Sequence, residues 1–286
     1  MPTYEAETVR FQGAEPEVSD GASSWYARAQ NFVVCYSTVA PGGSLSMRGS
    51  ENEYMAGLAA GSFEFEAGAE RASASSDAVV IVPPGDSTIR SRAGGVLFRV
   101  FAPPSPELIA KCTNAGSYAS SRENVAPFEL WPMPAGGYKL RVYEYASLPA
   151  GARRIFRSRN IMLNWQGHPG GEARDLKRFT PHSHDDFEQG SLELWGAYVH
   201  HLRYPWEADS TAWRPDQRME IVPPGLTIMP ARVIHTSQGT AEWNCLADVF
   251  APPRVDFSLA GYVYNADEYP MPELTQAQKA TVARGE

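Results

Sequence analysis

Short apolar runs separated by glycine and proline turns recur along most of the chain, and this pattern constrains the fold more than any other feature. Runs 62–66 and 138–145 alternate apolar and polar side chains, as expected of strands with one buried face. Many short strands bounded by turn residues predict an all-β barrel or sandwich. The clearest runs cover residues 31–39, 62–66, 78–82, 96–101 and 138–145.

The composition excludes several classes of protein. The chain has 286 residues, 43% hydrophobic and 20% charged, which is a globular composition rather than a disordered one. This length suffices for one large or two ordinary domains. The formal net charge is −8, and no dense stripe of Lys or Arg offsets it, so we expect no nucleic-acid partner. No apolar run is long enough to cross a bilayer, so we expect no membrane partner.

The expected location is the cytoplasm. The N-terminus lacks both a basic segment and an apolar segment, so no signal peptide is predicted. Cys35, Cys112 and Cys245 are few, odd in number and widely spaced. This usage fits unpaired thiols in a reducing compartment better than a disulfide framework.

Residues 182–188 carry the strongest chemical signal. His182 and His184 are separated by one residue, so on a strand their side chains point to the same side. Glu188 follows after a three-residue spacer, and His235 comes later in an apolar run. Imidazole and carboxylate together are ligands of divalent transition metals. The sequence therefore predicts a metal site, whereas a surface His-x-His on an acidic loop would leave His235 unexplained.

These ligand types, followed by Gly196 and by the Pro230-x4-His235 spacing, resemble the two split motifs of the cupin superfamily. The resemblance implies that both motifs lie on neighbouring strands of a small β-barrel. It also implies one divalent transition metal per chain, which can be Mn, Fe, Ni, Co or Zn. The implied ligands are His182, His184, Glu188 and His235.

Three positions depart from the family pattern. Gly196 follows Glu188 after seven residues, where six are usual. Arg232 takes the place of a glycine, and Gly239 takes the place of an asparagine.

An internal repeat indicates two barrels in tandem. Phe-Ala-Pro-Pro occurs at 101–104 and again at 250–253. A second match, Ile-Val-Pro-Pro-Gly at 81–85 and 221–225, is interpreted as a false register. We therefore expect an all-β chain of two cupin barrels (double-stranded β-helix, or jelly-roll). The first covers residues 1–125 and the second 126–286, with the boundary near 105–135.

Only the second barrel is expected to bind metal. The repeat pairs Thr88 with His235 and Glu53 with Glu188, and all six histidines lie in the second half. We expect the first barrel to be structural, and the chain to form a homo-oligomer such as a dimer.

Residues 203–214 form an insertion with no counterpart in the first half. Its Arg203 and Arg214, flanked by two tryptophans, are predicted to lie at the barrel mouth and bind a small anionic or oxygenated substrate. A solvent-facing loop packed by its own aromatics is the alternative. Arg218 and Arg232 are further candidates for a carboxylate clamp.

Two further candidates lie on the strand after Gly196. His200 and His201 are consecutive, so one faces the cavity and the other solvent. We take His200 as the inward-facing, substrate-contacting residue, although a strand-end pair is the simpler interpretation. Tyr198 is also carried as a site candidate, although a tyrosine here is more often part of the core.

The resemblance implies enzymes acting on small oxygenated molecules. We expect a metal-dependent isomerase, lyase or hydrolase acting on a small acid, such as a sugar acid or a keto or hydroxy acid. A dioxygenase using non-haem iron is the first alternative. A non-catalytic, metal-containing binding bicupin is the second, and a closed metal site without open positions would favour it.

Overall fold

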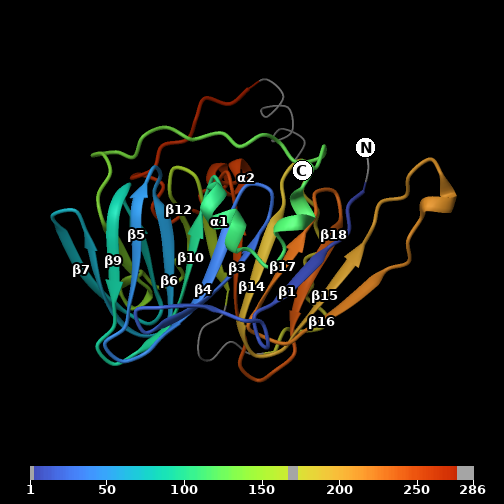
Figure 1. Ribbon diagram of the computed structural model, residues 1–286. Helices are drawn as coiled ribbons and strands as arrows, with labels where there is room; N and C mark the ends of the chain where they lie inside the picture. The colour runs from blue at the N-terminus through green and yellow to red at the C-terminus, as the bar shows by residue number, and fades with distance from the viewer. Residues whose placement is uncertain (1–2, 167–172, 276–286) are drawn as a thin grey trace.

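The computed structural model describes residues 3–166 and 173–275, and Figure 1 shows two β-barrels side by side. No helix among these residues is long and apolar enough to cross a membrane. The few helices are short: α1 (Pro106–Lys111), α2 (Val255–Leu259), and the 3-10 turns η1 (Ala115–Tyr118), η2 (Tyr145–Ser147) and η3 (Ser210–Ala212).

The first barrel is built from antiparallel strands that form two facing layers. One layer has the order β11-β8-β6-β10-β4-β3-β2, and the long strand β6 continues into the other layer, where it pairs with β7 and β9. Its strands are β2 (Glu17–Ser19), β3 (Ala22–Arg28), β4 (Val33–Val39), β5 (Ser44–Ser50), β6 (Tyr54–Ala67), β7 (Glu70–Ser75), β8 (Ala78–Val82), β9 (Gly85–Arg90) and β10 (Gly95–Phe101).

The second barrel repeats this plan. A six-stranded sheet, β1-β17-β14-β19-β13-β12, faces a three-stranded sheet, β16-β15-β18. The expectation of an all-β chain with two cupin-type barrels is therefore confirmed. Its strands are β12 (Ile155–Arg157), β13 (Met162–Gln166), β14 (Gln189–Trp195), β15 (Tyr198–Arg203), β16 (Gln217–Ile221), β17 (Gly225–Met229), β18 (Ile234–Gly239) and β19 (Cys245–Phe250).

Two strands are exchanged between the barrels. β1 (Glu7–Arg10) pairs with β17 of the second barrel, and β11 (Arg141–Glu144) pairs with β8 of the first. In Figure 1 the dark blue β1 accordingly lies beside the yellow and orange strands. The proposed division at residues 125 and 126 is thus crossed by one strand in each direction.

The strands also settle the register of the internal repeat. β10 and β19 both end at the phenylalanine of Phe-Ala-Pro-Pro. The segment 81–85 begins at the end of β8, whereas 221–225 precedes β17, the strand equivalent to β8. The Ile-Val-Pro-Pro-Gly match is therefore a false register, as expected.

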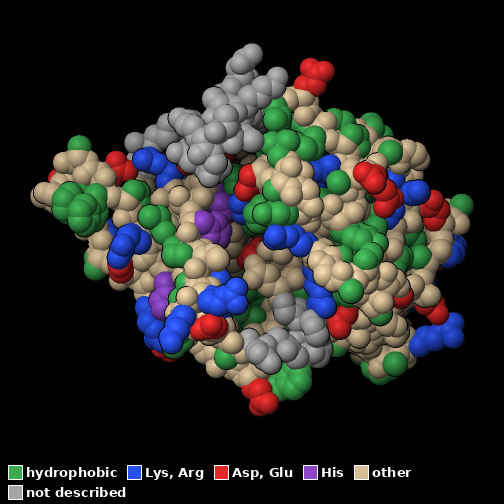
Figure 2. Space-filling view, turned by 180° about the vertical axis from the view of Figure 1, so that it is seen from behind, with side chains coloured by type: hydrophobic (Ala, Val, Ile, Leu, Met, Phe, Trp, Pro, Cys, Tyr) green, Lys and Arg blue, Asp and Glu red, His purple; other side chains and the backbone are tan. Residues whose placement is uncertain are grey.

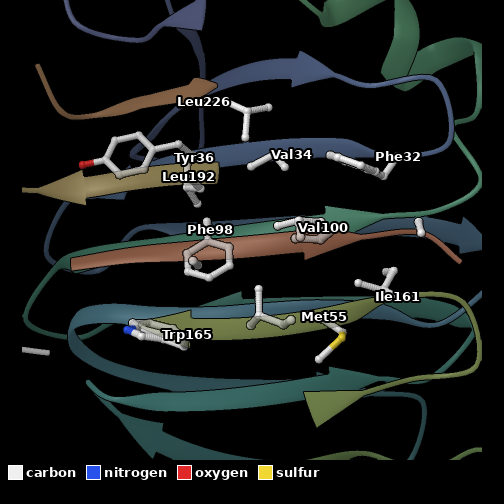
Figure 3. Packing of buried hydrophobic residues seen from close by; sticks show 14 of the residues in the cluster. Phe32, Val34, Tyr36, Met55, Phe98, Val100, Ile161, Trp165, Leu192 and Leu226 are labelled. Carbon is white, nitrogen blue, oxygen red and sulfur yellow. The ribbon is translucent and has the colours of Figure 1, made fainter. Parts of the chain in front are cut away.

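The largest hydrophobic core lies between the barrels and draws on both of them (Figure 3). Trp165 of β13 is 1% exposed, and its ring lies 5.3 Å from that of Phe98 on β10. Phe32, Met55, Leu192 and Leu226 belong to the same cluster. Because each barrel buries one sheet against the other, unfolding of either barrel exposes the shared part of the core of its neighbour.

We expect Trp165→Ala to destabilise the whole chain by about 3–5 kcal/mol, because a large side chain is lost from a shared core. Chemical denaturation should still give one cooperative transition when followed by tryptophan fluorescence and by circular dichroism. Separate transitions for the two barrels, with only one of them shifted by the substitution, would show that their cores are independent.

Candidate metal centre

His182 and His235 are brought together by backbone pairing across the second barrel. The amide of His182 donates to the carbonyl oxygen of His235 (3.1 Å), and the amide of His235 donates to that of His182 (2.8 Å). The amide of Arg232 donates to the carbonyl oxygen of His184 at 2.5 Å. The two sequence motifs are thus neighbours, as the resemblance implies.

Three imidazoles form a compact triangle inside this barrel. The ring centroid of His182 lies 5.1 Å from that of His184 and 4.6 Å from that of His235. The centroids of His184 and His235 are 4.9 Å apart. One ring nitrogen from each of the three lies within 4.8 Å of the others. A metal held about 2 Å from each nitrogen fits such a cluster after a small closure of the rings.

The environment of these rings also fits a metal. The Nδ1 atoms of His182 and His235 lie 3.0 and 2.9 Å from the carbonyl oxygens of Thr180 and Val233. A carbonyl only accepts, so each Nδ1 carries the proton and each Nε2 keeps its lone pair for a ligand.

The third imidazole has an unsatisfied nitrogen. The Nδ1 atom of His184 is buried without a hydrogen-bond partner among the described residues, while its Nε2 atom lies 3.4 Å from Nη1 of Arg254. A buried polar atom without a partner is costly, and a bound ion is one way to satisfy this ring. We conclude that the donor set fits a transition metal.

Burial keeps two of the three imidazoles neutral. Burial, and then the nearby His182, lower the pKa of His235 to about 3. The pKa of His184 is also lowered well below its usual value, first by burial and then by the neighbouring His235 and Arg254. Both rings are therefore unprotonated at neutral pH, which is the state that binds metal.

Glu188 does not join the triangle. Its carboxylate accepts hydrogen bonds from Tyr118 Oη (2.9 Å), Arg122 Nη1 (2.7 Å) and the amide of Gln30 (2.8 Å). All three partners belong to the first half of the chain. The structure therefore differs from the expected four-ligand set, because this carboxylate connects the two barrels.

The barrel without histidines contains the same arrangement. Glu53 accepts hydrogen bonds from Tyr269 Oη (2.8 Å) and from the amide of Arg159 (3.3 Å), and Arg141 lies 3.9 Å away. Each glutamate thus bonds to a tyrosine and a backbone amide of the opposite half. The expected pairing of Glu53 with Glu188 matches this geometry, and the shared role is structural.

Gln189 stands where a fourth ligand would be expected. Its Oε1 lies 3.4 Å from Nε2 of His235, while its Nε2 donates to Asp248 Oδ1 (2.9 Å) and to Ser191 Oγ (3.1 Å). The carboxylate of Asp248 needs a donor, so it orients the amide oxygen toward the histidines. Six residues separate Gln189 from Gly196, which is the usual family spacing and the signal that identifies this position.

The first-barrel counterpart of His235 is Ser87 rather than Thr88. On β14, Gln189 pairs with Met229, the last residue of β17; on β6, Tyr54 pairs with Val82, the last residue of β8. Because β8 and β17 are equivalent strands, Tyr54 is the equivalent of Gln189. The Tyr54 hydroxyl lies 2.9 Å from Ser87 Oγ, just as Gln189 approaches His235. Thr88 is half-buried and points the other way, because side chains alternate along β9.

A cavity of about 340 Å³ adjoins the histidines. Histidine side chains reach the surface on the face shown in Figure 2, with Lys and Arg side chains around them. The lining residues include His182, Gln189, His235, Asp248, Tyr198, Arg174 and Ser237.

Arg174 is the arginine of this cavity, and no sequence motif marks it. Its Nη1 donates to the carbonyl oxygen of Ser237 (2.9 Å) and its Nη2 to Thr180 Oγ1 (2.8 Å). No carboxylate of the described residues forms an ion pair with it. Burial lowers the pKa of Arg174, and the nearby Asp248 opposes that shift.

The arginines expected at the cavity lie elsewhere. Arg203 pairs with Asp216, and Arg214 lies 3.0 Å from Glu5. Arg218 pairs with Glu220 on exposed β16. The reason is that β15 and β16 pair with each other and extend as a hairpin away from the barrel (Figure 1).

Arg232 and the two tryptophans of the insertion also lie outside the cavity lining. The backbone of Arg232 is left-handed (φ 70°) and its guanidinium lies 3.8 Å from Glu207; this conformation explains why the family has glycine here. Trp206 and Trp213 stack on each other at 4.4 Å and are 73% and 44% exposed. The insertion thus has the geometry of the loop packed by its own aromatics.

The two remaining candidates face the interior. Tyr198 lines the cavity, and burial raises its pKa. His200 is fully buried behind the cavity wall, whereas His201 is half-buried and bonds to Gln238 (3.0 Å). This placement agrees with the expectation that one histidine of the pair faces the interior and the other faces outward. That His200 contacts the substrate stays a prediction.

No protein-family model matches the chain, and no curated protein sequence matches it. Solved structures with the same fold include protein YlbA of E. coli, which is 14% identical and aligns with a TM-score of 0.58 over 87% of this chain and 92% of that one. Oxalate decarboxylase from Lactobacillus farciminis, in complex with formate, is 14% identical with a TM-score of 0.59 over 91% and 92%. Oxalate decarboxylase from Bacillus subtilis is 12% identical with a TM-score of 0.60 over 91% and 81%. The chain therefore has the cupin fold of these proteins.

Proposed function

We propose that the second barrel binds one divalent transition metal and that the protein is a metal-dependent enzyme acting on a small oxygenated acid. The proposed ligands are His182, His184, His235 and the Oε1 atom of Gln189. The observation that carries this proposal is the triangle of three imidazoles, two of which, His182 and His235, line a cavity. The cavity volume of about 340 Å³ suits a small molecule.

The charges around the cavity favour an anionic substrate. Imidazole and amide ligands carry no negative charge, so they leave the charge of a divalent metal uncompensated; the carboxylate of Glu188 is held by Arg122 at 2.7 Å. Asp248 already accepts hydrogen bonds from Gln189, Ser191 and Gln166. A metal in such a site would supply Lewis-acid polarisation of a carboxylate or carbonyl oxygen.

Arg174 is the proposed carboxylate-binding residue. Its guanidinium lines the cavity, and within the described part of the chain its hydrogen bonds to Ser237, Thr180 and Arg178 leave part of its fork unused. A planar guanidinium matches a carboxylate in two-point contact. That oxalate decarboxylases share this fold supports an acid as the substrate class.

A dioxygenase using non-haem iron is the second candidate. The observation in its favour is the absence of Glu188 from the three-histidine cluster, because many cupin dioxygenases lack that glutamate. The cavity beside the histidines argues against the hypothesis of a non-catalytic binding protein.

Oxygen uptake during turnover of candidate acids distinguishes the dioxygenase from an isomerase, lyase or hydrolase. A dimeric assembly and a cytoplasmic location stay predictions from the sequence.

Metal analysis of variants tests the ligand set. We expect one metal per chain in the wild type, none in His182→Ala combined with His235→Ala, and at least a tenfold weaker affinity in Gln189→Ala, since a loss in this range follows when a metal site is impaired. Glu188→Gln should keep its metal but lose about 3–5 kcal/mol of stability, because Arg122 is left buried without its partner.

Glu53→Gln is the matched control, because it removes the equivalent carboxylate from the barrel without histidines. It should also lower stability and leave metal content unchanged. Loss of metal in Glu188→Gln alone, with Gln189→Ala unaffected, would restore Glu188 as the ligand.

Substitution of arginines tests the substrate-binding assignment. Arg174→Ala should raise KM for an acidic substrate well beyond tenfold without removing the metal, since an unpaired carboxylate in a partly desolvated site costs about 2–5 kcal/mol. Steady-state kinetics with Arg203→Ala and Arg214→Ala as controls should be unchanged, because these side chains pair with Asp216 and Glu5 outside the cavity. If either control variant raised KM strongly and Arg174→Ala left KM unchanged, the substrate would be bound by the insertion at residues 203–214 instead.

A further inference from the structure

We propose that Ser237, His200 and Glu193 form a proton relay in which the hydroxyl of Ser237 is the general base of the cavity. This inference rests on the proposed function and narrows it to substrates that must lose a proton. Ser237 is the catalytic residue, and the other two act through it.

The three residues lie in line from the cavity into the barrel wall. Ser237 lines the cavity, and its Oγ lies 2.9 Å from Nδ1 of His200. The Nε2 atom of His200 lies 2.6 Å from Oε1 of Glu193. Both His200 and Glu193 are fully buried, so solvent does not compete for the contact between them.

Strand register places the relay beside the histidine triangle. His200 of β15 lies opposite Ser237 of β18, and Leu202 lies opposite His235. Residues two apart on a strand face the same side. The Ser237 hydroxyl therefore faces the same interior as His235, one step farther along β18.

The contacts specify where the protons sit. The carboxylate of Glu193 accepts from Nε2–H of His200, which leaves Nδ1 with a lone pair to accept from the Ser237 hydroxyl. Burial raises the pKa of Glu193, and the hydrogen bond from His200 opposes this shift. The carboxylate thus fixes the tautomer that can take a proton.

One proton-transfer step follows from this arrangement. A substrate proton moves to Oγ of Ser237 while the hydroxyl proton moves to Nδ1 of His200. The electron pair of the broken bond stays on the substrate, and Ser237 ends as a neutral hydroxyl. His200 becomes an imidazolium whose charge Glu193 stabilises. The reverse step returns the proton to the substrate.

The first barrel shows that the fold does not require these polar residues. Glu193 pairs with Gly225 and Leu246, as Leu58 pairs with Ala78 and Leu97. His200 pairs with Ser237, as Phe65 pairs with Ile89. The register-equivalent residues Leu58, Phe65 and Ile89 all lie in one buried apolar cluster.

This comparison separates a functional relay from a structural one. Burying a carboxylate and an imidazole is costly even when they are paired. The barrel that lacks the histidine triangle fills the same three positions with hydrocarbon, and it packs without a polar network there. The polar residues occur only in the barrel that carries the triangle, so we assign them to its chemistry.

Nitrogen NMR of the full chain loaded with Zn²⁺ tests the relay without any substrate. We expect His200 to carry its proton on Nε2 and none on Nδ1, with His200→Gln identifying the signals. Ser237→Ala should shift the Nδ1 signal of His200 by removing its hydrogen-bond donor. A proton on Nδ1 would overturn the proposal, because that nitrogen could not accept another.

Kinetics with an acid that the wild type turns over provides the second test. Ser237→Ala and His200→Phe should lower kcat by about 10²–10⁴-fold while KM and metal content stay unchanged, and Ser237→Thr should restore much of the rate. His201→Phe and Gln238→Ala are the matched controls, because this pair lies on the outer face of the same two strands.

An unchanged kcat in Ser237→Ala would overturn the relay while leaving the metal enzyme intact. Failure of the wild type to turn over any small acid would instead contradict the proposed function, and the NMR result would then decide the relay alone. The variant with Glu193→Leu, His200→Phe and Ser237→Ile copies the first barrel and should fold. This variant controls for a collapse of the barrel.

Discussion

The alternation of side chains along antiparallel strands decides which residues meet inside each barrel. On β18 it sends His235 and Ser237 to the interior, and on β15 it sends His200 inward and His201 outward. A shift of one residue would exchange every inner side chain for an outer one. The inward positions of His235, Ser237 and His200 therefore follow from a single register, which is the pairing of β15 with β18.

A second constraint is the reciprocal connection between the barrels. Glu188 reaches a tyrosine and a backbone amide of the first half, and Glu53 reaches the same kinds of partner in the second. Exchange of β1 and β11 adds a strand to each barrel from the opposite half. The second barrel thus holds its histidines on a frame that includes the first barrel, which explains why a barrel without the triangle is retained.

Much of the fold and part of the candidate site could be predicted from local sequence, whereas the other site residues depend on long-range contacts. The strand runs, the two barrels and the meeting of His182 with His235 follow from periodicity and motif spacing. Glu188 was expected as a ligand because residue types alone cannot separate it from Gln189, one position later; the distance to Gly196 carried that information. Arg174 has no motif, and pairing over more than 200 residues, as in β1 with β17, leaves no local signal.

The most direct test of the account is anomalous diffraction from crystals of the metal-loaded chain. We predict one anomalous peak per chain, between His182, His184 and His235, with the amide oxygen of Gln189 toward it. The carboxylate of Glu188 should remain on Arg122. A peak coordinated by Glu188, or a second peak of equal height inside the first barrel, would contradict it.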